Sequence, residues 1–141
     1  IVTIDAELDE GSEGVLYALG AFSGGLTMWI EQGKLTYEYN LFQIERTRIS
    51  TTSPLPTGKA TITVETTKTG DNHAAPLDVV IRVNGDEVAK GTVPRSAPLT
   101  FTANDTFDVG RDSYSPVSEA YFNRKPFAFN GNINRLHVAY K

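Results

Sequence analysis

Hydrophobic and polar residues alternate along most of this chain, and the alternation is clearest on either side of the Gln32-Gly33 pair. Glycine readily adopts a positive φ, so this pair predicts a two-residue hairpin loop with Glu31 opposite Lys34. Side chains point to alternate faces of a strand, so in this register one face is apolar and the other is polar apart from Trp29. We expect the polar face to be mostly solvated and the other face to be core: Leu26, Met28, Ile30, Leu35, Tyr37, Tyr39 and Leu41.

The same reading extends to the rest of the chain, where turn residues separate short alternating runs. Asn84-Gly85 is the strongest of the remaining hairpin signals; a two-residue loop places Arg82 opposite Glu87, and a longer, bulged loop fits equally well. No segment carries an apolar stripe at helical spacing. The predicted strands cover residues 1–9, 15–20, 26–31, 34–41, 44–51, 59–67, 77–83, 88–93, 99–102, 106–110 and 131–140.

Many short strands with Gly and Pro between them indicate an all-β fold, either an antiparallel sandwich or a barrel. With 141 residues and no repeat or linker, the chain is predicted to be a single domain spanning residues 1–141. The connection at residues 111–129 is unusually long and rich in aromatic residues. Such a segment is expected either to fold back on the domain or to meet a partner.

Composition narrows the classes of function. The net charge is −4 with a pI of about 5.1, and no basic stripe is visible, so we expect no nucleic-acid partner. No run approaches the roughly 20 apolar residues of a membrane helix, so no membrane partner is expected either. The chain begins without Met or a signal peptide, and we expect it to be a piece of a longer protein. Its compartment, cytoplasmic or periplasmic/secreted, is not predicted.

Motifs for catalysis are not found. The sequence has no Cys, which excludes disulfides and Cys-ligated zinc, and its two histidines, His73 and His137, lie outside any HExxH spacing. It also has no GxSxG elbow, P-loop or Rossmann glycine pattern. No catalytic residue and no cofactor are therefore assigned to this domain.

Two loops hold oxygen-rich side chains that could bind a ligand. The first is Asp71-Asn72-His73, and the second carries the spaced carboxylates Asp105, Asp108 and Asp112. Calcium prefers carboxylate and carbonyl oxygens from irregular loops, so the second set is a weak calcium candidate. Asp and Asn also hydrogen-bond their own backbone in turns, and that interpretation is favoured here.

Several aromatic residues are candidates for a ligand or partner surface. Trp29 stands on the polar face of the hairpin, where it would be either a sugar-stacking platform or covered by another layer or domain, the second being favoured. Tyr114, Tyr121 and Phe122 belong to the long connection and are candidates for the same kind of surface.

The order and spacing of many short motifs resemble the β-sandwich domain that follows the catalytic domain in many bacterial arylsulfatases. The resemblance covers nearly the whole chain from about Gly14 and departs mainly at residues 67–76, where a glycine-rich loop is expected. The residues that carry it are Gly14-Val-Leu-Tyr-Ala-Leu-Gly20, Gly33-Lys34-Leu35, Tyr37-Glu38-Tyr39-Asn40 with Phe42, Glu45-Arg46, Leu55-Pro-x-Gly58-Lys59, Val83-x-Gly85, Val88-Ala89-x-Gly91, Asn104-Asp-Thr-Phe-Asp-Val-Gly-Arg-Asp112, Pro116-Val117, Pro126-Phe127-x-Phe129 and Gly131.

This resemblance implies a concanavalin A-like, laminin G-like jelly-roll sandwich of the lectin/glucanase type. It also implies a parent sulfatase that hydrolyses sulfate esters with a formylglycine and a divalent metal such as Ca²⁺. Sulfatase active sites use Cys or Ser, then Pro two residues on and Arg two further. Here Ser96 and Pro98 fit, but Thr100 stands where Arg is required. The isolated domain is therefore expected to be inactive.

Three functions follow, in order of preference. The first is a non-catalytic accessory domain that packs on the sulfatase catalytic domain of the same chain, through the long aromatic connection. The second is a carbohydrate-binding module that presents a sulfated glycan, although a net negative charge disfavours a polyanion. The third is a free-standing jelly-roll glycoside hydrolase, which would need paired carboxylates across a cleft.

Overall fold

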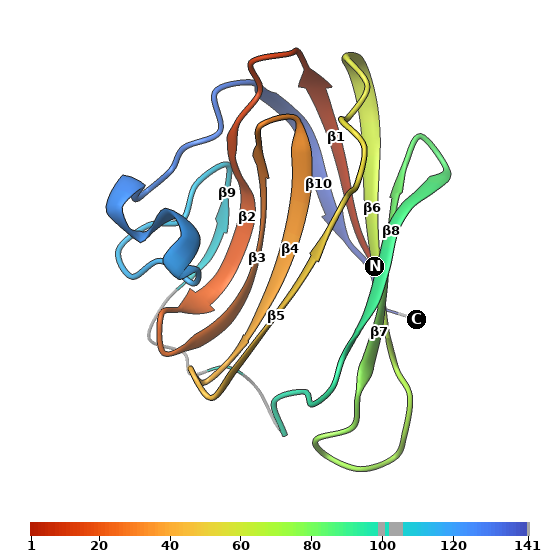
Figure 1. Cartoon of the computed structure of the whole chain (residues 1–141), viewed down its shortest axis with the longest axis vertical. Helices are drawn as coiled ribbons and strands as arrows, with labels where there is room; N and C mark the ends of the chain where they lie inside the picture. Colours follow the sequence, from red (N-terminus) through yellow and green to blue (C-terminus); the bar gives the residue numbers. More distant parts are fainter. Residues whose placement is uncertain (99–100, 102–105, 141) are drawn as a thin grey trace.

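Two antiparallel sheets of five strands each face one another in the computed structural model, which describes residues 1–98, 101 and 106–140 (Figure 1). One sheet has the strand order β10-β1-β6-β7-β8 and the other β5-β4-β3-β2-β9. The strands are β1 (Val2–Leu8), β2 (Gly14–Ala21), β3 (Gly24–Glu31), β4 (Lys34–Leu41), β5 (Glu45–Ser50), β6 (Gly58–Lys68), β7 (Leu77–Val83), β8 (Asp86–Val93), β9 (Phe107–Val109) and β10 (Asn132–Val138).

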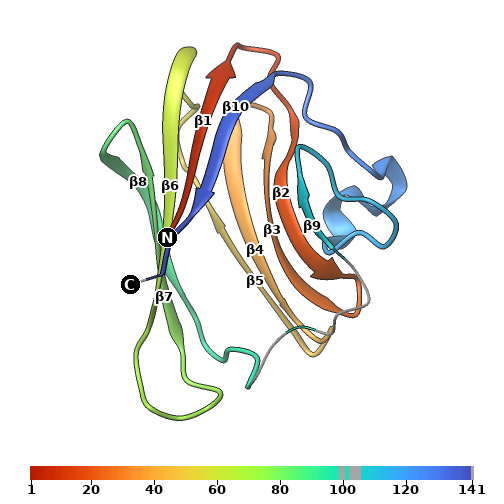
Figure 2. The same ribbon diagram turned by 180° about the vertical axis from the view of Figure 1, so that it is seen from behind.

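This architecture confirms the predicted antiparallel jelly-roll β-sandwich. The two ends of the described chain lie together on one sheet (Figure 2). Ile1 N donates to Ala139 O at 2.7 Å, and Ala139 N donates to Ile1 O at 2.9 Å. In the described part of the chain, no helix is long and apolar enough to cross a membrane.

The central hairpin of β3 and β4 has the predicted register. Glu31 pairs with Lys34 and Met28 with Tyr37, as the two-residue loop requires. Gln32 and Gly33 both have positive φ, 51° and 73°, which is the backbone of a type I′ turn. This turn twists in the sense of the strands and fixes the pairing.

The second hairpin, β7–β8, has the two-residue loop, which the sequence did not distinguish from a longer, bulged one. Its loop is the two-residue Asn84-Gly85 turn, and Arg82 pairs with Glu87. The register shifts between Ile81 and Arg82, so the irregularity lies within the strand pair and not in the loop. The strand predicted at 99–102 falls mainly on residues outside the described part of the chain.

The main core fills the space between the sheets. The buried residues of this core come from the inward faces of β1, β3, β4, β6 and β7. Burial alternates along β1, β6 and β7, whose outward faces are more exposed, but not along β3 and β4. On the side where β5 meets β8 the sandwich is tight: a Cβ added to Gly91 would lie 2.9 Å from Ile49 Cγ1. The hydroxyl of Tyr37 is buried in this core without a hydrogen-bond partner among the described residues.

The outer face of the central hairpin corrects the expectation that it is mostly solvated. Thr27, Trp29, Glu38 and Asn40 are all buried. Residues 111–129, which we call the covering segment, fold back over β2 and β3 (Figures 1 and 2). The prediction was wrong because alternation shows which residues share a face and does not show whether a later segment covers that face.

Candidate functional site

The covering segment packs on the outer sheet through a second apolar cluster. Its short 3-10 helix η1 (Glu119–Arg124) places Tyr121 over Trp29, edge to face, with ring centroids 5.3 Å apart. Phe127 packs on Tyr121 at a tilt, with ring centroids 5.5 Å apart. The remaining members of this cluster are Val15, Ala18 and Val117.

Backbone hydrogen bonds hold the C-terminal end of the covering segment on the domain. Val15 N donates to Phe127 O and Phe129 N to Gly110 O, both at 2.8 Å. Gly14 allows this approach, because a Cβ there would lie 2.4 Å from Ala128 O. The segment is thus an integral, packed layer of the domain.

A buried carboxylate, Glu38, anchors the middle of the covering segment. Its side chain is fully buried, and Arg46 Nη1 and Arg48 Nε donate to its two oxygens at 2.8 and 2.5 Å. The hydroxyl of Ser118 donates to the same carboxylate at 2.8 Å. Arg46 Nη1 also reaches Val117 O at 2.8 Å, so the arginine ties β5 to the segment.

A second buried carboxylate, Asp112, belongs to the covering segment itself. Asp112 Oδ2 accepts hydrogen bonds from Val117 N at 2.8 Å and from the Tyr121 hydroxyl at 2.5 Å. The Tyr121 hydroxyl also lies 2.9 Å from Thr27 Oγ1. Burial, followed by the charge and hydrogen bond of Asp112, raises the pKa of Tyr121 far above its ordinary value. Glu38 therefore fastens the covering segment to the sheet, and Asp112 orders the segment from within by holding Val117 and Tyr121.

The predicted oxygen-rich loops are not brought together into one site. Asp71, Asn72 and His73 are exposed in the connection between β6 and β7. Asp105 falls outside the described residues. In the described part of the chain, no group of three or more His, Asp or Glu side chains gathers around a point where a metal ion could bind.

Asp108 lies on the edge strand β9 and stabilises the loop that follows it. Its carboxylate accepts hydrogen bonds from Ser113 N at 2.7 Å and from Thr106 Oγ1 at 2.9 Å. Burial alone would raise the pKa of Asp108, but these bonds, one from the Ser113 side chain and the charge of Arg111 outweigh it and lower the pKa. This role is the turn-forming interpretation favoured from the sequence.

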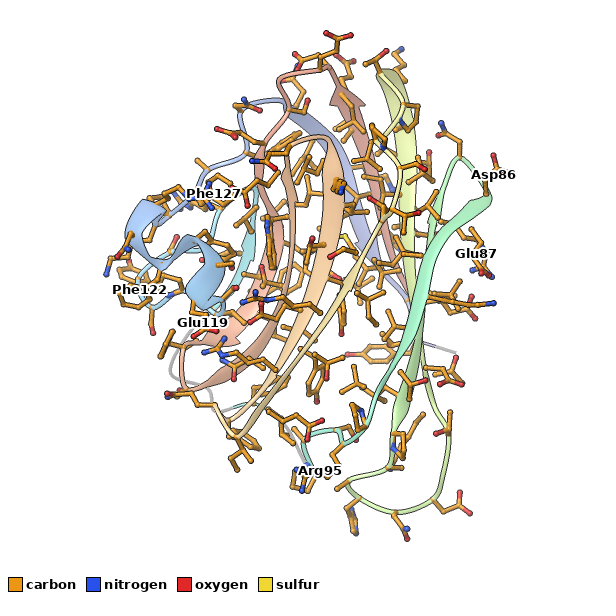
Figure 3. All side chains as sticks on the ribbon, viewed as in Figure 1. Asp86, Glu87, Arg95, Glu119, Phe122 and Phe127 are labelled. Carbon is orange, nitrogen blue, oxygen red and sulfur yellow. The ribbon has the colours of Figure 1, made fainter. Side chains whose placement is uncertain are left out.

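The four aromatic candidates divide into buried and exposed pairs. Trp29 and Tyr121 are 4% and 1% exposed, so neither presents a ring to a ligand. Tyr114 is 84% exposed and Phe122 is 40% exposed. Phe122 also meets Phe22 edge to face at 5.2 Å, and Figure 3 shows it on the outside of the covering segment.

An apolar opening, which the sequence did not reveal, lies between the two sheets at the β9 and β10 edges. It is a cavity of about 600 Å³. Val109 pairs with Tyr17 and Val138 with Val2, so the edge strands turn apolar side chains toward the space between the sheets. We define the opening by its exposed large apolar lining residues, Ile1, Phe107, Val138 and Tyr140.

Sequence reasoning missed Glu38 and the opening for different reasons. Glu38 pairs with Arg48, and Asn40 with Arg46. Once the β4–β5 hairpin is drawn, two arginines therefore lie around one glutamate on the face that also holds Trp29, a signal that this face is covered. The opening depends on the gap between two edge strands from different sheets, which no local pattern encodes.

Comparison with known proteins identifies the fold. No family model and no curated protein matches the chain. Among solved structures, domains LG4-5 of the mouse laminin alpha1 chain superpose with a TM-score of 0.72 at 18% sequence identity. The fold is a laminin G-like β-sandwich. The match covers 96% of this chain and 34% of the laminin chain, so the present chain spans about a third of that structure.

This laminin G-like fold agrees with the fold that the sequence resemblance implied. At 18% identity the match concerns the architecture alone. Arylsulfatase parentage rests on the sequence motifs alone.

Proposed function

We propose that this laminin G-like domain is a non-catalytic accessory domain of an arylsulfatase-type protein, packing against the catalytic domain of the same chain. The order of motifs from Gly14 to Gly131 supports the parentage. The observation that carries the packing role is the apolar opening. Large contiguous apolar patches are uncommon on soluble monomers and mark surfaces that another domain or protein buries.

The opening has the character of such a surface. Ile1, Phe107, Val138 and Tyr140 are 37%, 41%, 46% and 98% exposed, and they come from both sheets. Burying these side chains against another domain would stabilise the contact by about 25 cal/mol for each Å² of apolar surface removed from water. A domain attached beside Ile1 would start next to the opening, since the hydrogen bonds between Ile1 and Ala139 hold both chain ends there.

This proposal moves the partner surface away from the covering segment. Most of the aromatic residues of that segment, including Tyr121 and Phe127, are used inside the domain. The partner surface therefore shifts to the β9 and β10 edges.

Sulfate-ester hydrolysis would belong to the parent, which would supply the formylglycine and a divalent metal such as Ca²⁺. In this chain the buried carboxylates Glu38 and Asp112 accept structural hydrogen bonds. A carbohydrate-binding role is the second candidate, favoured by the exposed ring of Tyr114. No observation on the described residues favours the glycoside hydrolase alternative.

Two tests address the proposal. The coding sequence upstream of Ile1 is expected to specify Cys or Ser, any residue, Pro, any residue and Arg; an upstream domain without this motif would refute the parentage. The purified chain should not hydrolyse 4-nitrophenyl sulfate above buffer, with or without added Ca²⁺, and measurable turnover would overturn the non-catalytic role.

A further inference from the structure

We propose that Tyr114, Arg111 and Lys125 form a binding site for an anionic saccharide, meaning a sugar that carries a sulfate ester or a carboxylate. The proposal rests on the carbohydrate-binding role named above as the second candidate and gives it a site and a ligand class. It is separate from the packing role, because this site lies on the covering segment and the apolar opening lies at the β9 and β10 edges. It rests on a cavity, an exposed aromatic ring and two cations.

The cavity is a shallow, open surface depression of about 370 Å³ between the two ends of the covering segment. Its lining residues are Arg111, Ser113, Tyr114, Lys125 and Pro126. Asp112 N donates to Pro126 O at 2.8 Å, which ties the two walls together. This bond holds the backbone of the two sides of the depression together.

Tyr114 has features that stability does not explain. Its φ is +59°, a left-handed backbone that costs a non-glycine residue roughly 1 kcal/mol or more. Its ring is 84% exposed, and it stacks on no other ring within the described residues. A strained backbone that presents a bare aromatic ring beside a cavity points to recognition of a ligand with a flat, apolar face.

The charge of the cavity indicates an anion. Arg111 and Lys125 are exposed, and neither forms an ion pair within 4.0 Å in the part of the chain that the structure describes. Lys125 Nζ lies 5.2 Å from the centre of the Phe122 ring. Asp108 is the nearby opposing charge for Arg111, but its carboxylate accepts hydrogen bonds from Ser113 and Thr106.

A sugar that carries an anionic group would match both the exposed tyrosine ring and the two cations. The apolar face of a pyranose ring can lie on an exposed tyrosine. Arg111 can form a two-point hydrogen bond with a sulfate or carboxylate, and Lys125 adds a mobile point charge. The site also answers the objection that the whole chain has a charge of −4, because the local cations lie where the aromatic ring is.

Calorimetric titrations of the 141-residue chain with three sugars show whether the site binds a sulfate ester or a carboxylate. These are a chondroitin 4-sulfate tetrasaccharide, the unsulfated chondroitin tetrasaccharide and neutral cellotetraose. Binding of the first alone assigns a sulfate ester, and equal binding of the first two assigns the carboxylate. Binding of none, or equal binding of all three, overturns the proposal.

Variants test the residues. Arg111→Gln and Lys125→Gln should each weaken binding of the preferred tetrasaccharide about tenfold, the scale of one lost charge-assisted hydrogen bond. Arg135→Gln on β10 is the matched control and should bind normally. Equal affinity of the two site variants and the control would contradict the assignment.

Tyr114→Gly separates binding from stability. Glycine tolerates the positive φ, so the variant should melt higher by roughly 2–4 °C while losing at least about tenfold in affinity. Tyr140→Gly removes a similarly exposed ring at the opening and should bind normally. Unchanged affinity of Tyr114→Gly would sink the site, while the non-catalytic packing role would stand on its own tests.

Discussion

Trp29 and Tyr121 meet edge to face, with ring centroids 5.3 Å apart and planes at 75°. One belongs to β3 and the other to η1 in the covering segment. Because of this contact, the outer face of β3 is buried under the covering segment. It explains why the same face also holds Glu38 and Asn40, which are fully buried and hydrogen-bonded to the covering segment or its anchors.

The buried carboxylate of Glu38 should be the most sensitive polar group in the domain. Glu38→Gln removes the charge that Arg46 and Arg48 share and leaves Arg46, only 15% exposed, without its counter-ion. Breaking such a pair from one side costs about 3–5 kcal/mol in the free energy of unfolding. Urea denaturation followed by tryptophan fluorescence measures this, because Trp29 is the single Trp in the sequence.

An exposed ion pair provides the control for that measurement. Glu87 and Lys90 lie 3.3 Å apart on β8, with side chains 44% and 72% exposed. Glu87→Gln should change the free energy of unfolding by less than about 0.5 kcal/mol. If Glu38→Gln were as mild as this control, Glu38 would not be the anchor of the covering segment.

Removing one hydroxyl should loosen the same layer without removing its packing. Tyr121→Phe keeps the ring against Trp29 and Phe127 but deprives the buried Asp112 of a donor. The expected loss is about 1.5–3 kcal/mol, the scale of a hydrogen bond to a charged group. Tyr114→Phe, on an exposed ring, is the matched control and should be neutral; equal effects of the two would contradict this account.

Much of this fold can be predicted from the sequence because local rules dominate it. The Gln32-Gly33 turn fixes the register of β3 and β4, and alternation then selects the core residues of both strands. What alternation cannot supply is the partner of each outward face. Trp29 signalled that something covers its face, but only the fold shows that residues 111–129 do so.

For the candidate ligand residues, too, the sequence did not show which side chains the fold buries. Asp112 was a carboxylate in a polar loop by sequence, and the structure buries it against Tyr121. Tyr114 and Tyr121 looked equivalent, since both are tyrosines in one aromatic-rich segment, yet one is 84% exposed and the other 1%. Tyr121 lies in η1 over Trp29, whereas Tyr114 lies in the irregular stretch before η1 with a φ of +59°, and composition does not encode this difference.

High pH should unfold the domain through its buried tyrosines. Burial raises the pKa of Tyr17, Tyr37 and Tyr121 above the ordinary value of 10.0. Above that value the unfolded chain releases these protons while the native state retains them. The free energy of unfolding should therefore be unaffected by these groups below pH 10 and fall above it, by about 1.4 kcal/mol per pH unit for each tyrosine.

Tyr37→Phe tests this pH dependence at one site. The Tyr37 hydroxyl has no hydrogen-bond partner among the described residues, so the variant should keep its stability at pH 7 or gain up to about 1 kcal/mol. Above pH 10 its stability should fall less steeply than that of the parent chain. Denaturant midpoints measured from pH 7 to 11 give both results, and a loss at pH 7 would show that the hydroxyl has a stabilising role.

The accessory role is tested most directly by size-exclusion chromatography of the 141-residue chain mixed with the separately expressed segment that precedes it. The two should co-elute, and Val138→Asp at the apolar opening should abolish co-elution. Ile44→Asp, on an exposed turn outside the opening, should leave it intact. Separate elution of the two unmodified pieces, or co-elution undisturbed by Val138→Asp, would contradict docking through the opening.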